Sequence, residues 1–181
     1  MGIAKNEQPP VKLFFALTVS QAALFETIES RLALEYGPID WRTEPFAFNH
    51  TNHYEKEMGP NLEKKFFSVT SLMLMPELAE VKIHTNRVEN LFLNDRGGRR
   101  INLDPGYLSL CKVVLATTKD YDHRIYVGGG IFEEVTLTYK KEGGFQPWPW
   151  TYPDYRAPKT LGAFNTLREL YREQLKNPVM P

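Results

Sequence analysis

The feature that most restricts the fold is an uninterrupted apolar run near the start of the chain, within residues 11–19 (VKLFFALTV). A strand with one face in water alternates apolar and polar residues, whereas every residue from Leu13 to Leu17 is apolar. Such a run is typical of a strand that is covered on both faces. The sequence therefore predicts a buried β-strand with a packed layer on either side.

The next segment predicts an amphipathic helix. Ser20 can cap its start, because a serine hydroxyl accepts a hydrogen bond from a free N–H of the first turn. Gly37 followed by Pro38 is a typical helix end. The apolar residues between them recur at the helical period: Leu24, Ile28, Leu32 and Tyr36.

Four further elements complete the first half of the chain, in the order strand, strand, helix, strand. Their predicted ranges are 39–49, 65–75, 76–93 and 101–103. Pro45 indicates an edge position or an irregularity, since proline cannot donate to a strand ladder. Residues 81–85 also alternate like a strand, which leaves a shorter helix as the alternative. The whole order, βαββαβ, is that of a ferredoxin-like split βαβ fold.

Residues 105–118 permit two structures. Asp104 followed by Pro105 is a helix-start signal, and the apolar residues beyond it recur at helical spacing. A buried strand is the alternative, because Val113 and Val114 are β-branched and the run is almost wholly apolar. A helix over residues 105–118 is the favoured interpretation.

The remainder predicts a meander and a closing helix. Strands are expected over 124–127, 132–139 and 145–148, separated by glycine-rich turns. An aromatic loop, 148–155, precedes a helix over 161–175. The predicted fold class is therefore α+β, a ferredoxin-like βαββαβ core extended by a helix, an antiparallel three-strand meander and a C-terminal helix. Residues 1–10 are expected to be a disordered tail, and 11–181 a single domain.

Composition excludes several partners. The 181 residues carry 22 basic and 22 acidic side chains, whereas a duplex-DNA binder normally has a basic excess. No segment is long and apolar enough for a membrane span, and the first ten residues lack the apolar core of a signal peptide. Cys111 is the only cysteine, so no internal disulfide can form, which suits a reducing compartment. The Cys111 side chain is expected to be buried and inert. We therefore expect a cytoplasmic protein with neither duplex DNA nor a membrane as partner.

One set of polar residues is the main candidate for a binding site. Arginine and lysine can neutralise a phosphate or carboxylate, an aspartate beside a histidine can make a general base, and aromatic faces can stack a base or sugar. The pattern predicts a small anionic or nucleotide-like ligand, with His123 as the base if there is catalysis. The alternative is a set of helix caps and surface ion pairs. The candidates are Asn102, Asp104, Lys119, Asp120, His123, Arg124, Tyr152, Asp154 and Arg156.

A metal site is the weaker candidate. His50, His53 and Glu57 are spaced so that a helix would place them on one face, an arrangement that suits zinc. A solvated loop is the favoured interpretation, because no fourth ligand is apparent. No metal is therefore assigned, and the cofactor is unknown.

Several function classes lack their motifs. There is no GxxxxGK[ST] phosphate loop, and residues 118–121 (TKDY) carry tyrosine where the guanine-reading motif of GTPases needs aspartate. The paired HxT/S motifs of two-histidine phosphoesterases are missing. RNA binding through an aromatic sheet face is less favoured, since the RNP signature is absent. A non-catalytic protein-interaction module that uses the aromatic loop 148–155 remains the alternative function.

Five groups of residues carry a resemblance to a known family. They are YGPID (36–40), YEKEMGP (54–60), NLDPGY (102–107), TKDY with HRIY (118–121, 123–126) and WTYPDYR (150–156). With them the chain resembles an uncharacterised prokaryotic family, domain of unknown function 4416, over nearly its whole length. The resemblance implies no established activity, ligand or catalytic residue.

Overall fold

The computed structural model describes residues 2, 8–49 and 54–176. Within them, nine strands form one antiparallel sheet with the order β2-β4-β1-β5-β6-β8-β7, in which β3 also pairs with β4 and β9 with β8. The strands are β1 (Val11–Val19), β2 (Ile39–Arg42), β3 (Phe46–Ala47), β4 (Glu63–Met73), β5 (Ile101–Leu108), β6 (Lys112–Thr117), β7 (Ile125–Gly128), β8 (Ile131–Lys140) and β9 (Gly144–Pro147).

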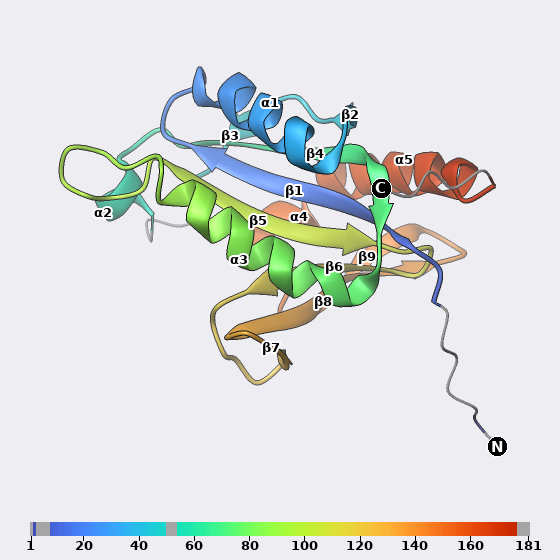
Figure 1. Cartoon of the computed structure of the whole chain (residues 1–181). Helices are drawn as coiled ribbons and strands as arrows, with labels where there is room; N and C mark the ends of the chain where they lie inside the picture. The colour runs from blue at the N-terminus through green and yellow to red at the C-terminus, as the bar shows by residue number, and fades with distance from the viewer. Residues whose placement is uncertain (1, 3–7, 50–53, 177–181) are drawn as a thin grey trace.

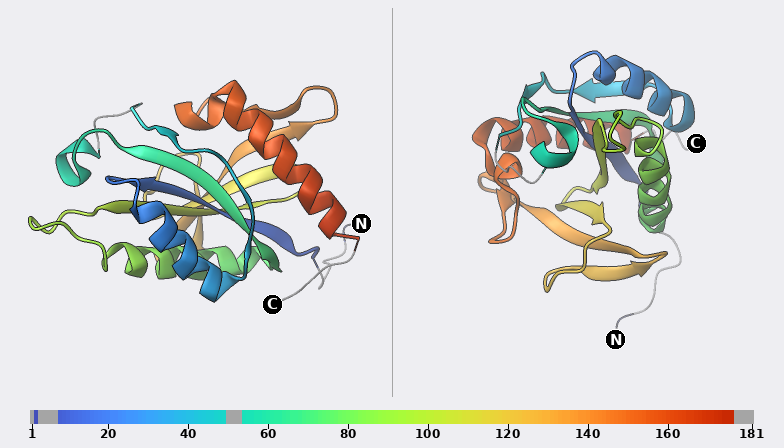
Figure 2. Two further views of the ribbon diagram at one scale, coloured as in Figure 1. Left: turned by 90° about the horizontal axis from the view of Figure 1, so that it is seen from above. Right: turned by 90° about the vertical axis from the view of Figure 1, so that its left-hand side faces the viewer.

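Helices cover both faces of this sheet. Helices α1 (Leu24–Tyr36) and α3 (Leu78–Glu89) lie on one face, and α5 (Pro158–Gln174) lies on the other, as the two viewing directions of Figures 1 and 2 show. Two short helices, α2 (Glu55–Met58) and α4 (Pro153–Arg156), and a 3-10 turn, η1 (Met75–Glu77), complete the described elements. The α+β class is confirmed.

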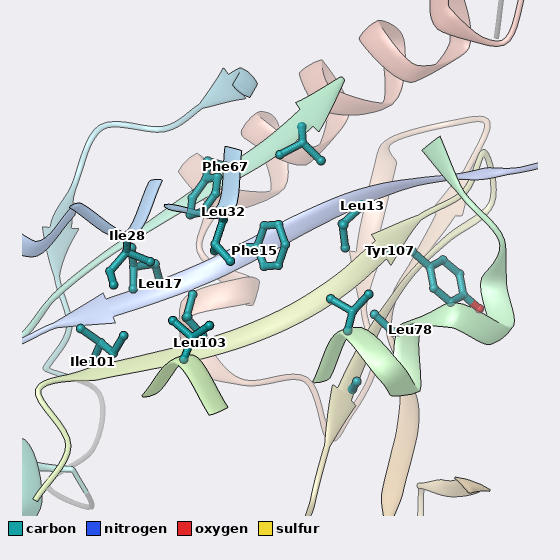
Figure 3. Packing of buried hydrophobic residues seen from close by; sticks show 14 of the residues in the cluster. Leu13, Phe15, Leu17, Ile28, Leu32, Phe67, Leu78, Ile101, Leu103 and Tyr107 are labelled. Carbon is teal, nitrogen blue, oxygen red and sulfur yellow. The ribbon is translucent and has the colours of Figure 1, made fainter. Parts of the chain in front are cut away.

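Strand β1 is the central strand that its apolar run predicts. Its side chains alternate between the two cores: Phe15 and Leu17 pack against α1, with Ile28 and Leu32, whereas Phe14 packs on the opposite face against α5. Figure 3 shows the first of these cores. Because both faces of β1 are covered, the strand has no polar face and its sequence does not alternate.

The first helix ends as predicted but begins differently. Gly37 terminates α1 with a φ of 99° and donates its N–H to the Ala33 carbonyl at 3.1 Å. The predicted Ser20 cap is wrong, since α1 begins three residues after Gln21 and has no side-chain cap. Ser20 instead donates its backbone N–H to Arg100, which ties β1 to the start of β5.

The predicted strand over 39–49 is two short strands, β2 and β3, that both pair with β4 and leave Pro45 between them. The predicted helix over 76–93 is shorter, since α3 spans Leu78–Glu89, and the strand-like alternation at 81–85 is not used.

The favoured helix over residues 105–118 is wrong. This segment is a β-hairpin, the end of β5 followed by β6, and Asp104 and Pro105 lie inside β5 rather than at a helix start. The apolar run is continuous because both faces of the hairpin are covered, and its helical spacing is therefore fortuitous. Cys111 lies in the turn of this hairpin and is exposed, so its predicted burial is also wrong.

Strands β5 and β6 pair only at the hairpin end and then separate. Their register covers Gly106 to Leu108 of β5, and the ladder stops at Pro105, which has no N–H to donate. Side chains of α3 bind the backbone groups that β6 leaves free: Glu89 accepts the Leu103 N–H at 2.6 Å, and Lys82 donates to the Leu103 carbonyl at 2.8 Å. The separation opens a gap in the sheet beside the first half of β5.

The second half follows the predicted meander, with β7, β8 and β9 joined by the glycine turns at 128–130 and 142–144, and α5 closing the chain from Pro158 to Gln174. Most of the predicted tail, residues 1 and 3–7, lies outside the described residues. None of the helices in the described ranges is long and apolar enough to cross a membrane.

Candidate functional site

A cavity of about 210 Å³ lies where β5 and β6 separate. Its wall draws on both sides of the sheet, since Lys82 and Asn86 come from α3, whereas Asp154 and Tyr155 come from α4 on the opposite face. Most of the predicted site residues lie in this wall, although they come from three separate parts of the chain. Those that line the cavity are Asn102, Asp104, Lys119, Arg124, Tyr152 and Asp154.

Asp104 is held by two donors on the β5 side of the cavity. Lys82 Nζ lies 3.0 Å from Oδ1 and Asn102 Nδ2 lies 2.7 Å from Oδ2, while the side chain is 31% exposed. Burial by itself would raise the pKa of Asp104, but the ammonium groups of Lys82 and Lys64, with these hydrogen bonds, lower the pKa below its usual 3.8. Asp104 is therefore an ionised acceptor at neutral pH.

Lys64, at the start of β4, forms the second ion pair. Its Nζ donates to Asp154 Oδ2 at 2.6 Å, and both side chains are buried. The ammonium also lies 5.0–5.4 Å from the ring centroids of Phe48, Phe66 and Tyr155. One of its three N–H donors is thus hydrogen-bonded within the described residues, and the others face aromatic rings.

Arg99 joins α2, α3 and β5 at one side of the cavity. It binds Glu57 with two parallel bonds, Nε–Oε1 at 2.7 Å and Nη2–Oε2 at 2.9 Å, and its Nη1 donates to Glu89 at 2.8 Å and Asn102 at 3.1 Å. The hydrogen bond with Glu57 is the main cause that raises the pKa of Arg99. Because four of its five donor hydrogens are occupied, Arg99 acts as a brace for the wall rather than a ligand-binding group.

Arg124 is a second brace, on the β8 side. Its Nε donates to Glu134 Oε2 at 2.7 Å, and Nη1 and Nη2 donate to the Lys119 carbonyl at 3.0 Å and the Tyr152 hydroxyl at 2.8 Å. The Arg124 and Glu134 side chains are each 1% exposed. This ion pair fixes the loop that follows β6 against β8 and places Tyr152 at the cavity.

Tyr155 is a buried polar group without a partner. The residue is 1% exposed, lines the cavity, and its hydroxyl makes no hydrogen bond within the described part of the chain. Burial raises the pKa of Tyr155 well above 10, and the charges of Asp154 and Asp104 raise it further, so the hydroxyl stays protonated. An unsatisfied buried hydroxyl costs free energy, about 1–3 kcal/mol, unless a ligand or water binds it.

Three predicted residues lie outside the cavity wall. Asp120 is exposed. His123 lies behind Glu134, with Nε2 3.1 Å from Glu134 Oε2 and Nδ1 3.0 Å from Asp122, so both ring nitrogens are already engaged. Arg156 donates to the backbone carbonyls of the preceding loop. The hydrogen bonds of His123 and Arg156 are thus with protein groups: two carboxylates for His123 and three backbone carbonyls for Arg156.

Two of the three weak metal-ligand candidates lie where the structure describes no residues. His50 and His53 lie outside the described residues, and Glu57 is bound by Arg99. No group of three His, Cys, Asp or Glu side chains within residues 2, 8–49 and 54–176 is placed to hold a metal ion.

Sequence reasoning missed four charged residues of the site: Lys64, Lys82, Arg99 and Glu134. A signal existed for Lys82, because it lies on the buried stripe of α3 with Leu78, Val81 and Thr85, where a charged side chain needs a partner. The alternation of β4 similarly places Lys64 on the same face as Phe66. No comparable pattern marks Arg99, whose partners come from distant parts of the chain.

Comparison with known proteins gives one match. A family model described as a domain of unknown function, DUF4416, matches residues 9–171. No curated protein and no solved structure matches the chain.

Proposed function

The chain belongs to the DUF4416 family, and on that premise we propose that it binds a small ligand through an anionic group in the cavity between β5 and β6. The observation that carries the proposal is the unpartnered hydroxyl of Tyr155. A protonated hydroxyl in this position donates to an oxygen acceptor, and phosphate and carboxylate groups supply such oxygens.

The lysines, rather than the arginines, supply the positive charge to this ligand. Lys64 and Lys82 use one and two of their three donors, respectively, within the described residues. Lys82 retains one N–H for a ligand oxygen, whereas the other donors of Lys64 face aromatic rings, so that Lys64 contributes its charge. Arg99 and Arg124 are occupied by carboxylates and carbonyls, and they orient the wall instead.

A tyrosine-to-phenylalanine pair tests the proposal. Tyr155→Phe removes only the unpartnered hydroxyl, so the folded state loses no internal hydrogen bond. Binding of pyrophosphate and of ribose 5-phosphate is measured by titration calorimetry. We expect Tyr155→Phe to weaken binding about tenfold or more, because a hydrogen bond to a charged group contributes roughly 1.5–3 kcal/mol, and to leave the melting temperature unchanged or raised.

Tyr171 provides the matched control. It is equally buried in the same layer, but its hydroxyl donates to the Pro10 carbonyl at 2.7 Å. Tyr171→Phe is expected to lower stability by about 1 kcal/mol and to leave affinity unchanged. Equal affinity of the wild-type chain and Tyr155→Phe for both probes, or no binding by the wild-type chain, contradicts the proposal.

The predicted aromatic loop, 148–155, is a loop only as far as Tyr152, because Pro153 begins α4. This segment supports a second candidate, a surface that docks a partner protein. Trp148, Trp150 and Tyr152 are 37%, 36% and 43% exposed. However, the two indoles stack on each other and the Tyr152 hydroxyl binds Arg124. The apolar area that these rings leave to a partner is therefore reduced, and we favour the cavity.

Two finer features of the chain complete the proposal. The order β2-β4-β1-β5, with α1 and α3 on one face, supports a ferredoxin-like core. The exposed free thiol of Cys111 supports a reducing compartment such as the cytoplasm.

A further inference from the structure

Four rings form a ladder on the surface beside the cavity. The ring centroids of Tyr121 and His123 lie 6.1 Å apart, those of His123 and Trp150 5.4 Å, and those of Trp150 and Trp148 5.2 Å, with interplanar angles of 21°, 17° and 2°. Trp148 ends this aromatic ladder: its one ring contact in the described chain is Trp150. A planar ring can therefore extend the ladder at Trp148.

Hydrogen bonds hold the ladder in place. Trp150 Nε1 donates to the Val135 carbonyl at 3.0 Å, and the Trp148 N–H donates to Thr151 Oγ1 at 2.8 Å. Arg156 Nη2 donates to the carbonyls of Trp148 at 2.8 Å and Pro149 at 2.5 Å. Because the rings are fixed before any ligand arrives, stacking on them costs little conformational entropy.

The ladder and the cavity share their supports. Glu134, in the cavity wall, accepts from both His123 and Arg124. Arg124 in turn binds the Tyr152 hydroxyl and places its guanidinium 4.5 Å from the Tyr121 ring centroid. The cavity wall and the ladder are therefore joined through the buried Arg124–Glu134 ion pair.

The cavity holds only a part of a ligand. Its volume of about 210 Å³ is below the roughly 300–1,000 Å³ typical of sites that enclose a drug-sized molecule. A ligand whose anionic group lies at Tyr155 must extend out of the cavity, and the ladder, which contacts Glu134 and Arg124 of the cavity wall, offers aromatic surface to the rest of it. From this arrangement, and resting on the proposed function, we infer that the ligand is a 5′-nucleotide, whose phosphates enter the cavity and whose base stacks on the ladder.

Charge favours a free nucleotide over a nucleic-acid strand. Asp120 and Asp122 are exposed next to the ladder, and Asp122 has a side-chain exposure of 99%. The chain as a whole has no net charge. A polyanionic strand crossing this surface would meet these carboxylates, whereas a small nucleotide has its charge in the lysine-bearing cavity.

Matched ligands separate the base from the phosphates. Affinities are measured for the 5′-mono-, di- and triphosphates of the four ribonucleosides, and for ribose 5-phosphate, pyrophosphate and triphosphate, which carry no base. Base stacking on an aromatic side chain contributes about 1–3 kcal/mol, so at least one nucleotide should bind about tenfold or more tightly than its base-free counterpart. Trp148→Ala should remove that gain and leave pyrophosphate affinity unchanged.

Tyr126→Ala is the control variant, because Tyr126 is an exposed ring outside the ladder that packs on Phe132. It should retain the gain. In a Trp41→Phe background the two ladder indoles are the only tryptophans, and a stacked base should quench their fluorescence. If nucleotides and base-free phosphates bind equally, the nucleotide inference is wrong and the anion site stands. If Trp148→Ala preserves the gain, the nucleotide inference is also wrong. If no nucleotide and no base-free phosphate binds, both the nucleotide inference and the proposed anion site are wrong.

Discussion

Arg124 and Glu134 form an ion pair of 2.7 Å in which each side chain is 1% exposed. Removing one partner of a buried ion pair leaves the other charge without compensation, at a cost of about 3–5 kcal/mol. Arg124→Met should therefore lower the free energy of unfolding by about that amount in urea titrations. The control is Arg172→Met, which breaks an exposed pair with Glu169 and should cost less than about 1 kcal/mol. Similar losses in the two variants would contradict the assigned role of the buried pair.

The carboxyl group of Glu133, on β8, should make the stability of the fold depend on pH. Burial raises the pKa of Glu133 to about 6, against a smaller opposing effect of Lys112. The folded state then binds more protons than the unfolded state between about pH 4.5 and 6, so this group makes stability fall as the pH rises through that window. Glu133→Gln should remove this fall and be more stable than the wild-type chain above pH 6. Urea titrations from pH 4.5 to 7 check this; parallel curves for the two proteins would show the assignment to be wrong.

Gly106 is required by close packing, where β5 meets β6. A Cβ at this position would lie 2.5 Å from both the Phe14 ring and the Val114 carbonyl oxygen. Gly106→Ala should destabilise the fold by about 1–3 kcal/mol or more, as overpacked cores do. Gly162 in α5 has open space around it, so Gly162→Ala should instead stabilise by about 0.5–1 kcal/mol. Opposite shifts in melting temperature are the expected result, and shifts of the same sign would contradict it.

Replacing Arg156 should loosen the loop at residues 148–151 and should not weaken anion binding. Its guanidinium donates to the carbonyls of Thr151, Trp148 and Pro149, so Arg156→Ala should release the loop from α4. Amide hydrogen exchange within residues 148–151 should accelerate, while pyrophosphate affinity should be unchanged. Arg168→Ala, whose Nε binds the distant Leu110 carbonyl, should leave the exchange of this loop as it is. A weakened pyrophosphate affinity in Arg156→Ala would place Arg156 in the site after all.

The sequence predicts the parts of this fold that depend on short-range patterns. The apolar run of β1 and the Gly37 end of α1 are local signals, and both are confirmed. The hairpin at 101–117 was missed because Asp104 and Pro105 also form a good helix start, and what decides between the two structures is pairing with β1, more than 80 residues away. Tertiary pairing therefore overrides the local preference here.

The candidate site divides in the same way. Residues with obvious chemistry stand out in the sequence by their residue types, and the fold brings three of them to one cavity: Asp104 in β5, Arg124 before β7 and Asp154 in α4. Lys64 and Lys82 were passed over, since lysines in strands and helices are mostly solvated. The periodicity of α3 and the alternation of β4 place both lysines on buried faces, but neither pattern shows the carboxylate partners, which meet the lysines only where β5 and β6 separate.

Glu89 and Lys82 of α3 bind the backbone N–H and carbonyl of Leu103, which a neighbouring strand would otherwise bind. Both main-chain groups of one residue therefore lose their partners together if the helix detaches. The Leu103 amide should consequently exchange with solvent at the rate at which α3 opens, and the helix and this half of β5 should unfold as one cooperative unit.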